Sequence, residues 1–173
     1  VFPVFRGDLM GSMASFRLKV GTRIGVISDT HGLLRPEVGE ALRGVPVILH
    51  AGDVGHVDVL RGLNAIAPTV AVRGNVDRGD FGATLPMNEC VEIGKRTIYL
   101  YHILQDLDVD PVASEFDLVI SGHSHRQELE EKEGVTYLNP GSCGPQRFSL
   151  PVSLAFLTVT KDGFDIEQIE LDT

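Results

Sequence analysis

The sequence predicts a mixed α/β (α+β) fold of two β-sheets packed face to face, with helices on the outside. Two observations support this prediction. Apolar strand patterns alternate with helical patterns in the first half of the chain, whereas strand patterns dominate the second half. The chain has 173 residues, of which 43% are hydrophobic and 23% charged, so it is long enough to bury a core of its own.

The first half has the pattern of a parallel α/β layer. Three short apolar runs rich in β-branched residues predict buried strands, at residues 23–28, 45–50 and 69–72. Two segments between them have helical patterns, residues 36–43 and 57–66. Pro36 suits a first helical turn, and Pro68 ends the second helix.

The second half is rich in strand patterns. Residues 89–93 and 96–102 predict a hairpin around Gly94-Lys95. Residues 105–116 are ambiguous, and Pro111 could open a short helix there. Further strands are predicted at residues 117–121, 127–132, 135–138, 152–160 and 164–171.

Residues 1–20 differ from the rest and predict a loosely ordered N-terminal extension, with residues 21–173 as a single domain. Polar residues and glycines interrupt every apolar stretch here, so no hydrophobic region of the length that a secretory signal needs is present. Chain termini are usually poorly ordered, which favours this interpretation. The alternative is an arm that packs on a partner subunit.

Charge and cysteine content exclude several classes of protein. The formal net charge of −9 argues against a general binder of nucleic acid or anionic membranes, although a local site for a phosphorylated substrate is compatible with it. The apolar runs are too short to span a bilayer, so no membrane segment is expected. Cys90 and Cys143 are too few for a disulfide framework, which favours a reducing, cytoplasmic location.

Residues that can bind metals follow five of the predicted strands. They are Asp29, His31, Asp53, Asn75, His102, His123 and His125. In open α/β sheets, functional sites gather beyond the carboxyl ends of strands. Nitrogen and oxygen donors without thiolates suit manganese, iron, zinc, cobalt or nickel rather than calcium or an iron–sulfur cluster.

Strand periodicity gives a first expectation for the two closely spaced pairs. If their segments are extended, Asp29 and His31 face the same way, and so do His123 and His125. Each motif alone has a commoner explanation, such as a turn with a capping aspartate. The ordered combination of all of them is much harder to obtain by chance.

The order of these motifs resembles that of the calcineurin-like metallophosphoesterase superfamily, and above all its small YfcE-type phosphodiesterases. The motifs are Asp29-Thr30-His31, Gly52-Asp53, Gly74-Asn75, His102 and Gly122-His123-Ser124-His125. The resemblance extends over residues 23–171. It implies a four-layer αββα sandwich of two mixed sheets flanked by helices, and a centre of two divalent metal ions.

The resemblance also implies a role for each residue. One ion would be held by Asp29, His31 and His125, the other by Asn75, His102 and His123, and Asp53 would bridge both. Asp53, Asn75 and His102 are the residues expected to take part in catalysis. Mn²⁺ is the expected ion, with Ni²⁺, Co²⁺, Fe²⁺ and Zn²⁺ as alternatives. His102 is followed by Ile103, where the family usually has glycine.

The implied reaction is hydrolysis of a small phosphodiester or phosphomonoester, by direct in-line attack of a metal-bound hydroxide on phosphorus. Many superfamily members carry a histidine after the asparagine of the third motif, and that histidine assists the leaving group. Val76 stands there in this chain and cannot supply a proton. We therefore expect activated diesters, such as aryl diesters, to be better substrates than alkyl monoesters.

Several neighbours of these motifs have two interpretations. Arg73 could contact a substrate phosphate or form an ion pair with Asp77 or a glutamate. His50 is interpreted as a core or supporting histidine, and His56 as part of the pocket rim. The Asn139–Ser142 loop is expected to support the site, and Cys143 to be a structural thiol.

Two other functions remain open. One is a scaffold that kept the fold and lost turnover, as in the eukaryotic retromer subunit with this fold. The other is a nuclease of the same superfamily, against which the charge of −9 and the lack of a basic, aromatic-rich stretch argue. Relatives are often dimers or tetramers, so a homodimer or homotetramer is expected.

Overall fold

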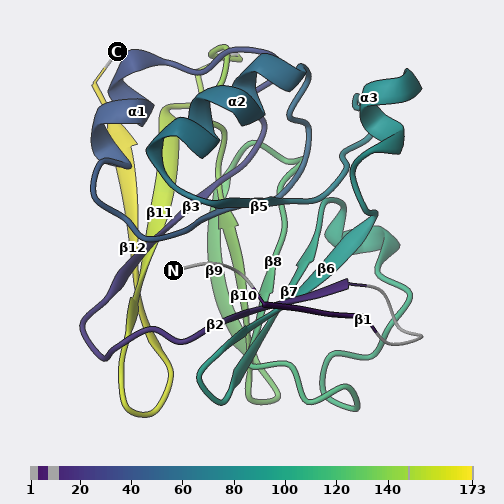
Figure 1. The fold of residues 1–173 in the computed structure, drawn as a ribbon, viewed down its shortest axis with the longest axis vertical. Coiled ribbons are helices and arrows are strands. Elements are labelled where there is room, and N and C mark those ends of the chain that lie inside the picture. Colours follow the sequence, from purple (N-terminus) through teal and green to yellow (C-terminus); the bar gives the residue numbers. More distant parts are fainter. Residues whose placement is uncertain (1–3, 8–11, 148, 173) are drawn as a thin grey trace.

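The computed structural model describes residues 4–7, 12–147 and 149–172 and arranges their strands in two sheets (Figure 1). The five-stranded sheet has the order β12-β11-β3-β4-β5, with β3, β4 and β5 parallel and β11 and β12 antiparallel. Its strands are β3 (Arg23–Ile27), β4 (Ile48–His50), β5 (Thr69–Ala71), β11 (Val152–Val159) and β12 (Phe164–Leu171).

The seven-stranded sheet has the order β1-β2-β6-β7-β8-β10-β9, and β7, β8 and β10 are parallel neighbours within it. Its strands are β1 (Val4–Gly7), β2 (Ser12–Phe16), β6 (Asn88–Ile93), β7 (Arg96–Tyr101), β8 (Leu118–Ile120), β9 (Gln127–Lys132) and β10 (Val135–Pro140). Both sheets are mixed, so the predicted fold class is confirmed.

Helices cover the outer faces unequally. The helices α1 (Pro36–Ala41) and α2 (Val57–Ile66) pack on the five-stranded sheet, because Val38, Val59 and Leu63 share one buried cluster with residues of β3, β4 and β11 (Figure 1). On the seven-stranded sheet, the short 3₁₀ helix η1 (Leu104–Asp106) and the turns after it cover the outer residues of β7, β8 and β10. The helical layer is therefore thin on this side.

The main core lies between the two sheets. Val26 and Leu49 from one sheet and Leu100 and Ile120 from the other belong to this core, and all four side chains have no exposed surface. Each buried side chain of this size contributes about 1.5–3 kcal/mol to the stability of the fold. The core thereby holds the edges of the two sheets, and the loops that follow their strands, in a fixed relative position.

The N-terminal segment differs from the loosely ordered extension that was expected for residues 1–20. The strand β2 pairs in parallel with β6, and β1 pairs with β2. Ala14 and Phe16 are 1% and 2% exposed in the core between the sheets. Residues 12–16 are therefore an integral strand, whereas residues 1–3 and 8–11 lie outside the described residues. The predicted boundary between an N-terminal extension, residues 1–20, and a single domain, residues 21–173, stays a prediction.

Two further segments differ in detail from the sequence analysis. No α-helix forms at Pro111; turns follow η1 there instead, and Phe116 packs under them. A short helix, α3 (Gly79–Ala83), was not predicted, because a five-residue segment with two glycines, Gly79 and Gly82, shows no helical period. Among the described residues, no helix is long and apolar enough to cross a membrane.

Candidate metal centre

All seven residues that the strand-end motifs singled out lie in one continuous network at the carboxyl ends of parallel strands. The five-stranded sheet provides Asp29 and His31 after β3, Asp53 after β4 and Asn75 after β5, and the seven-stranded sheet provides His102 after β7 and His123 and His125 after β8. Because both sheets present these ends to the same side, loops from the two sheets meet at the network.

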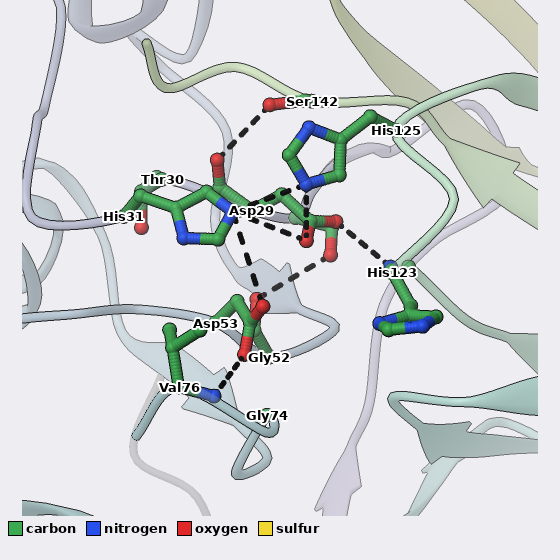
Figure 2. A network of polar contacts seen from close by, with 12 residues as sticks. Asp29, Thr30, His31, Gly52, Asp53, Gly74, Val76, His123, His125 and Ser142 are labelled. Atoms are coloured by element: carbon green, nitrogen blue, oxygen red, sulfur yellow. Dashed lines mark hydrogen bonds and ion pairs between the residues drawn. The ribbon is translucent and has the colours of Figure 1, made fainter. Parts of the chain in front are cut away.

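One half of the network consists of Asp29, His31 and His125. The Nε2 atoms of His31 and His125 lie 3.1 Å apart, and they lie 3.6 Å and 3.2 Å from Oδ1 of Asp29. Figure 2 shows both imidazole rings turned towards the Asp29 carboxylate. These three donor atoms are close enough together to hold one metal ion.

The other half consists of Asn75, His102 and His123. Oδ1 of Asn75 lies 3.1 Å from Nε2 of His102 and 2.9 Å from Nδ1 of His123. His102 is buried, whereas Asn75 and His123 are exposed. This half of the network is thus the one that a ligand can reach from solvent.

Asp53 lies between the two halves. Its Oδ2 atom is 3.3 Å from Nε2 of His102 and 3.9 Å from Nε2 of His31. Its Oδ1 atom accepts a hydrogen bond of 2.9 Å from the backbone N–H of Val76 (Figure 2). That bond fixes the carboxylate, so that one oxygen faces both halves.

The donor set fits a divalent cation. Oδ1 of Asp29 is buried and accepts no well-formed hydrogen bond in the described part of the chain; its nearest neighbours are the Nε2 atoms of His125 and His31, so a cation between these three atoms would satisfy it. Metal–nitrogen bonds are about 2.0–2.1 Å long, so two nitrogens about 3 Å apart can both reach one ion. The two Nε2 atoms of His31 and His125 have that spacing, 3.1 Å.

The backbone places these side chains in a way that strand alternation did not predict. Asp29, His31, Asp53, His123 and His125 all have positive φ, between 46° and 69°. The expectation of extended segments is therefore wrong, although Asp29 and His31 still reach the same half of the network. The left-handed residues reverse the chain locally, and His123 and His125 turn to different halves of the network.

Glycines next to the functional residues allow the loops to approach closely. A Cβ atom on Gly74 would lie 2.0 Å from Oδ1 of Asp53, and one on Gly52 would lie 2.7 Å from Nδ1 of His102. At Gly122 it would lie 2.7 Å from Oδ2 of Asp29. Any larger residue would displace the carboxylates or the ring, which explains why glycine precedes Asp53, Asn75 and His123 in the sequence.

Burial and charge act in opposite directions on the acidic residues of the network. Burial raises the pKa of Asp29, but the imidazoles of His125 and His102 outweigh it, and the net pKa is lowered. Asp53 behaves likewise, because His102 and the N–H of Val76 outweigh burial. Burial lowers the pKa of His102, but its contact with Asp53 and the charge of Asp29 raise it overall. Both carboxylates are thus held in the ionised form that binds cations.

His102 is oriented by the backbone behind it. Its Nδ1 atom lies 2.7 Å from the carbonyl oxygen of Ala51, so this nitrogen carries a proton and donates it. Nε2 is thereby the atom directed at Asp53 and Asn75. A backbone carbonyl that orients a ligating histidine in this way is a common feature of metal sites.

His50 is a buried supporting histidine, as its position in the strand indicated. Its Nδ1 atom accepts a hydrogen bond of 3.2 Å from the N–H of Gly52, and its Nε2 atom lies 2.9 Å from Oγ1 of Thr30. Thr30 in turn donates to the carbonyl of Val54. Burial lowers the pKa of His50 to about 4, so the ring is neutral at pH 7 and connects the loops after β3 and β4.

Asp77 connects two loops of the site, a role that the sequence analysis missed. Its carboxylate accepts hydrogen bonds from the N–H groups of Val54, Gly55 and Gly74, at 3.1, 2.7 and 2.8 Å. The ion pair considered between Arg73 and Asp77 is absent, since in the described part of the chain Arg73 donates instead to the sulfur of Met87.

Other residues near the site hydrogen bond to the backbone of its loops rather than to the side chains of the network. Asn139 donates to the carbonyl of Gly122 at 2.7 Å, and Ser142 donates to the carbonyl of Asp29 at 3.0 Å. The Cys143 thiol is fully buried and burial raises its pKa to about 12, which agrees with a structural thiol. The exposed His56 caps α2 by accepting from the N–H of Asp58, and its place at the pocket rim stays a prediction.

Comparison with known proteins agrees with this geometry. The sequence model of the calcineurin-like phosphoesterase superfamily domain matches residues 22–162. The chain belongs to this superfamily. A protein described as a probable metallophosphoesterase, from Methanothermobacter thermautotrophicus, is 37% identical over 158 residues, which cover 84% of this chain and 91% of that protein.

Two solved structures show the same fold. A novel archaeal phosphodiesterase matches with a TM-score of 0.64 and 25% identity, covering 86% of this chain and 99% of its own. Vps29 of Entamoeba histolytica, solved in complex with Zn²⁺, also matches with a TM-score of 0.64, at 23% identity, over 87% of this chain and 99% of its own. The chain is thus a calcineurin-like metallophosphoesterase by family, with candidate metal-binding residues in place.

Proposed function

We propose that the chain is a phosphodiesterase that depends on two divalent metal ions, with Mn²⁺ as the expected ion. One observation carries this proposal: donor atoms from two sheets converge into two adjacent groups, and Asp53 lies between them. Such a pair of groups suits direct in-line displacement at phosphorus, for which no protein nucleophile is needed.

Each residue has a distinct part in this proposal. Asp29, His31 and His125 would hold one ion, Asn75, His102 and His123 the other, and Asp53 would contact both. Two divalent ions, when bound, lower the pKa of water and offset negative charge on phosphoryl oxygens. Asn75 provides an oxygen without adding a negative charge beside the substrate. The Ala51 carbonyl and the Val76 N–H keep His102 and Asp53 in position.

The leaving group receives no help from the position after Asn75. Val76 is 40% exposed, its backbone N–H donates to Asp53, and its side chain carries no group that can supply a proton. A substrate whose leaving group departs without a proton is therefore favoured. We propose aryl phosphodiesters as better substrates than alkyl monoesters, and comparable kcat/KM values for a p-nitrophenyl monoester and the matching diester would contradict this preference.

The proposed activity is tested by hydrolysis of bis-p-nitrophenyl phosphate after removal and return of metal. Chelation should abolish activity, and manganese should restore it. Asp53→Asn should lower kcat by at least about a hundredfold, because the carboxylate shared by both halves is lost. Asp58→Asn, which alters an exposed carboxylate on α2, is the matched control and should retain activity.

Other outcomes would favour the competing functions. Purified protein with no bound metal, and no turnover with manganese, nickel or cobalt, would contradict the enzyme and favour a scaffold. Degradation of plasmid DNA would favour a nuclease. A cytoplasmic location and a homodimer or homotetramer complete the proposal, and the free thiols of Cys90 and Cys143 are compatible with a reducing compartment.

A further inference from the structure

A cavity of about 100 Å³ opens beside one half of the candidate metal centre. Asn75 and His102 form its inner wall. Its remaining wall is formed by Arg73, Gly74, Met87, Tyr101, Ile103 and Asp106. No residue of the other half, Asp29, His31 or His125, lines it, so the cavity extends sideways from the more exposed half of the network.

The outer wall of this cavity has an apolar character that the network itself lacks. Met87 is 49% exposed, and Tyr101 and Ile103 are half-buried beside it. Covering the exposed Met87 thioether and the half-buried Ile103 with an apolar group removes apolar surface from water, which favours binding. Methionine also adapts its shape to aromatic groups and makes favourable contacts with their edges. The wall is therefore suited to a ring.

Arg73 brings an unpaired positive charge to the same wall. Its backbone N–H donates to the carbonyl of Pro86 at 2.7 Å, and its Nε donates to the sulfur of Met87 at 3.1 Å. The other guanidinium nitrogens contact no acceptor among the residues that the structure describes. Asp77, the nearest acid in sequence, is occupied by three backbone N–H groups. Arg73 is thus free to bind phosphoryl oxygens.

We propose that this cavity holds one ester substituent of the substrate, a single aromatic or heteroaromatic ring, while Arg73 contacts the phosphoryl oxygens next to it. The size supports one ring, since an apolar cavity of about 150 Å³ accommodates benzene and this one, of about 100 Å³, is open to solvent. The inference rests on the proposed phosphodiesterase and specifies its substrate class.

The test compares the affinities of two non-hydrolysable probes for the full chain loaded with manganese. Calorimetry gives the Kd of phenylphosphonate and of methylphosphonate. The wild type should bind phenylphosphonate about tenfold more tightly, because its phenyl ring would cover Met87 and Ile103. Met87→Glu should remove most of this ratio, because it places a carboxylate against the ring. Arg73→Gln should weaken both probes about tenfold and leave their ratio unchanged.

Leu129→Glu is the matched control, because Leu129 on β9 is also 49% exposed and lies outside the cavity. It should keep the wild-type ratio. Equal affinity of the wild type for both probes, or an unchanged ratio in Met87→Glu, would overturn the inference even if bis-p-nitrophenyl phosphate is hydrolysed. Ring-selective binding without hydrolysis under any metal would support the cavity and overturn the phosphodiesterase.

Discussion

At the scale of single residues, the site depends on side chains that never touch a ligand. His50 bonds to Gly52 and Thr30 and so connects two of the loops that carry metal-binding residues. It does so only as the neutral ring, because its Nδ1 atom must accept a hydrogen bond. Protonation of this one ring therefore opposes the folded state.

This role predicts a pH dependence of stability. The pKa of His50 is about 4 in the folded chain, against about 6.5 in an unfolded one. Below pH 6.5 the unfolded chain binds a proton at His50 that the folded chain does not, so the free energy of unfolding decreases as the pH falls from 6.5 towards 4. Between pH 7 and pH 5 the loss should be about 2 kcal/mol.

Urea unfolding of the metal-free protein at both pH values measures this loss. Glutamine in His50→Gln keeps a donor and an acceptor but does not titrate. The decrease in unfolding free energy from pH 7 to pH 5 should therefore be about 2 kcal/mol smaller in this variant than in the wild type. His56→Gln, in an exposed ring, is the control and should keep the wild-type loss. Equal losses in His50→Gln and the wild type would contradict the assigned role.

The sequence was sufficient to select the residues of the network, because metal-binding types at successive strand ends form a rare pattern. It did not reveal how they are placed. The positive φ of Asp29 and His31 depends on tertiary packing, such as the bond from the N–H of His31 to the carbonyl of Asp53. Asp77 was missed as well, because its three partners come from two loops that only the fold brings together.

At the scale of elements, β2 is the main departure from prediction. Its sequence lacks an unbroken apolar run, and its partner β6 lies more than seventy residues further along the chain, so local patterns could not reveal the pairing. Strands such as β3 and β4 were predicted well, since their residues are buried on both faces and read as continuous apolar runs.

The placement of β2 makes Phe16 a test of this element. Phe16 is 2% exposed between the two sheets, so Phe16→Ala should lower the free energy of unfolding by about 3–5 kcal/mol, measured by urea denaturation. Val20→Ala changes a residue that is 62% exposed and should have little effect. A change below about 1 kcal/mol in Phe16→Ala would support a loosely held extension instead.

At the scale of the whole molecule, the candidate metal centre joins the two sheets. Asp29, His31 and Asn75 follow strands of one sheet, and His102 and His125 follow strands of the other. A cation held between them would act as a cross-link that exists only in the folded state. Metal binding should therefore stabilise the entire domain rather than a single loop.

A thermal unfolding series checks this cross-link. At about a hundred times its Kd, one bound ion adds about 2.7 kcal/mol, which corresponds to a rise in Tm of about 5–10 °C for a domain of this size. Manganese should produce this rise and calcium a much smaller one, because imidazole nitrogens dominate the donor set. Asp53→Asn should reduce the rise. Equal shifts with both ions would contradict a nitrogen-rich site.

The positive φ angles of the candidate metal-binding residues indicate which selection pressure has kept them in the sequence. Of the seven non-glycine residues with positive φ in the described chain, five are Asp29, His31, Asp53, His123 and His125. Glycine would relieve about 1 kcal/mol at each such position. Selection for stability alone would drive these positions towards glycine, so the residues found there record selection for their chemistry. A search for thermostable variants that ignores activity would erase the site first.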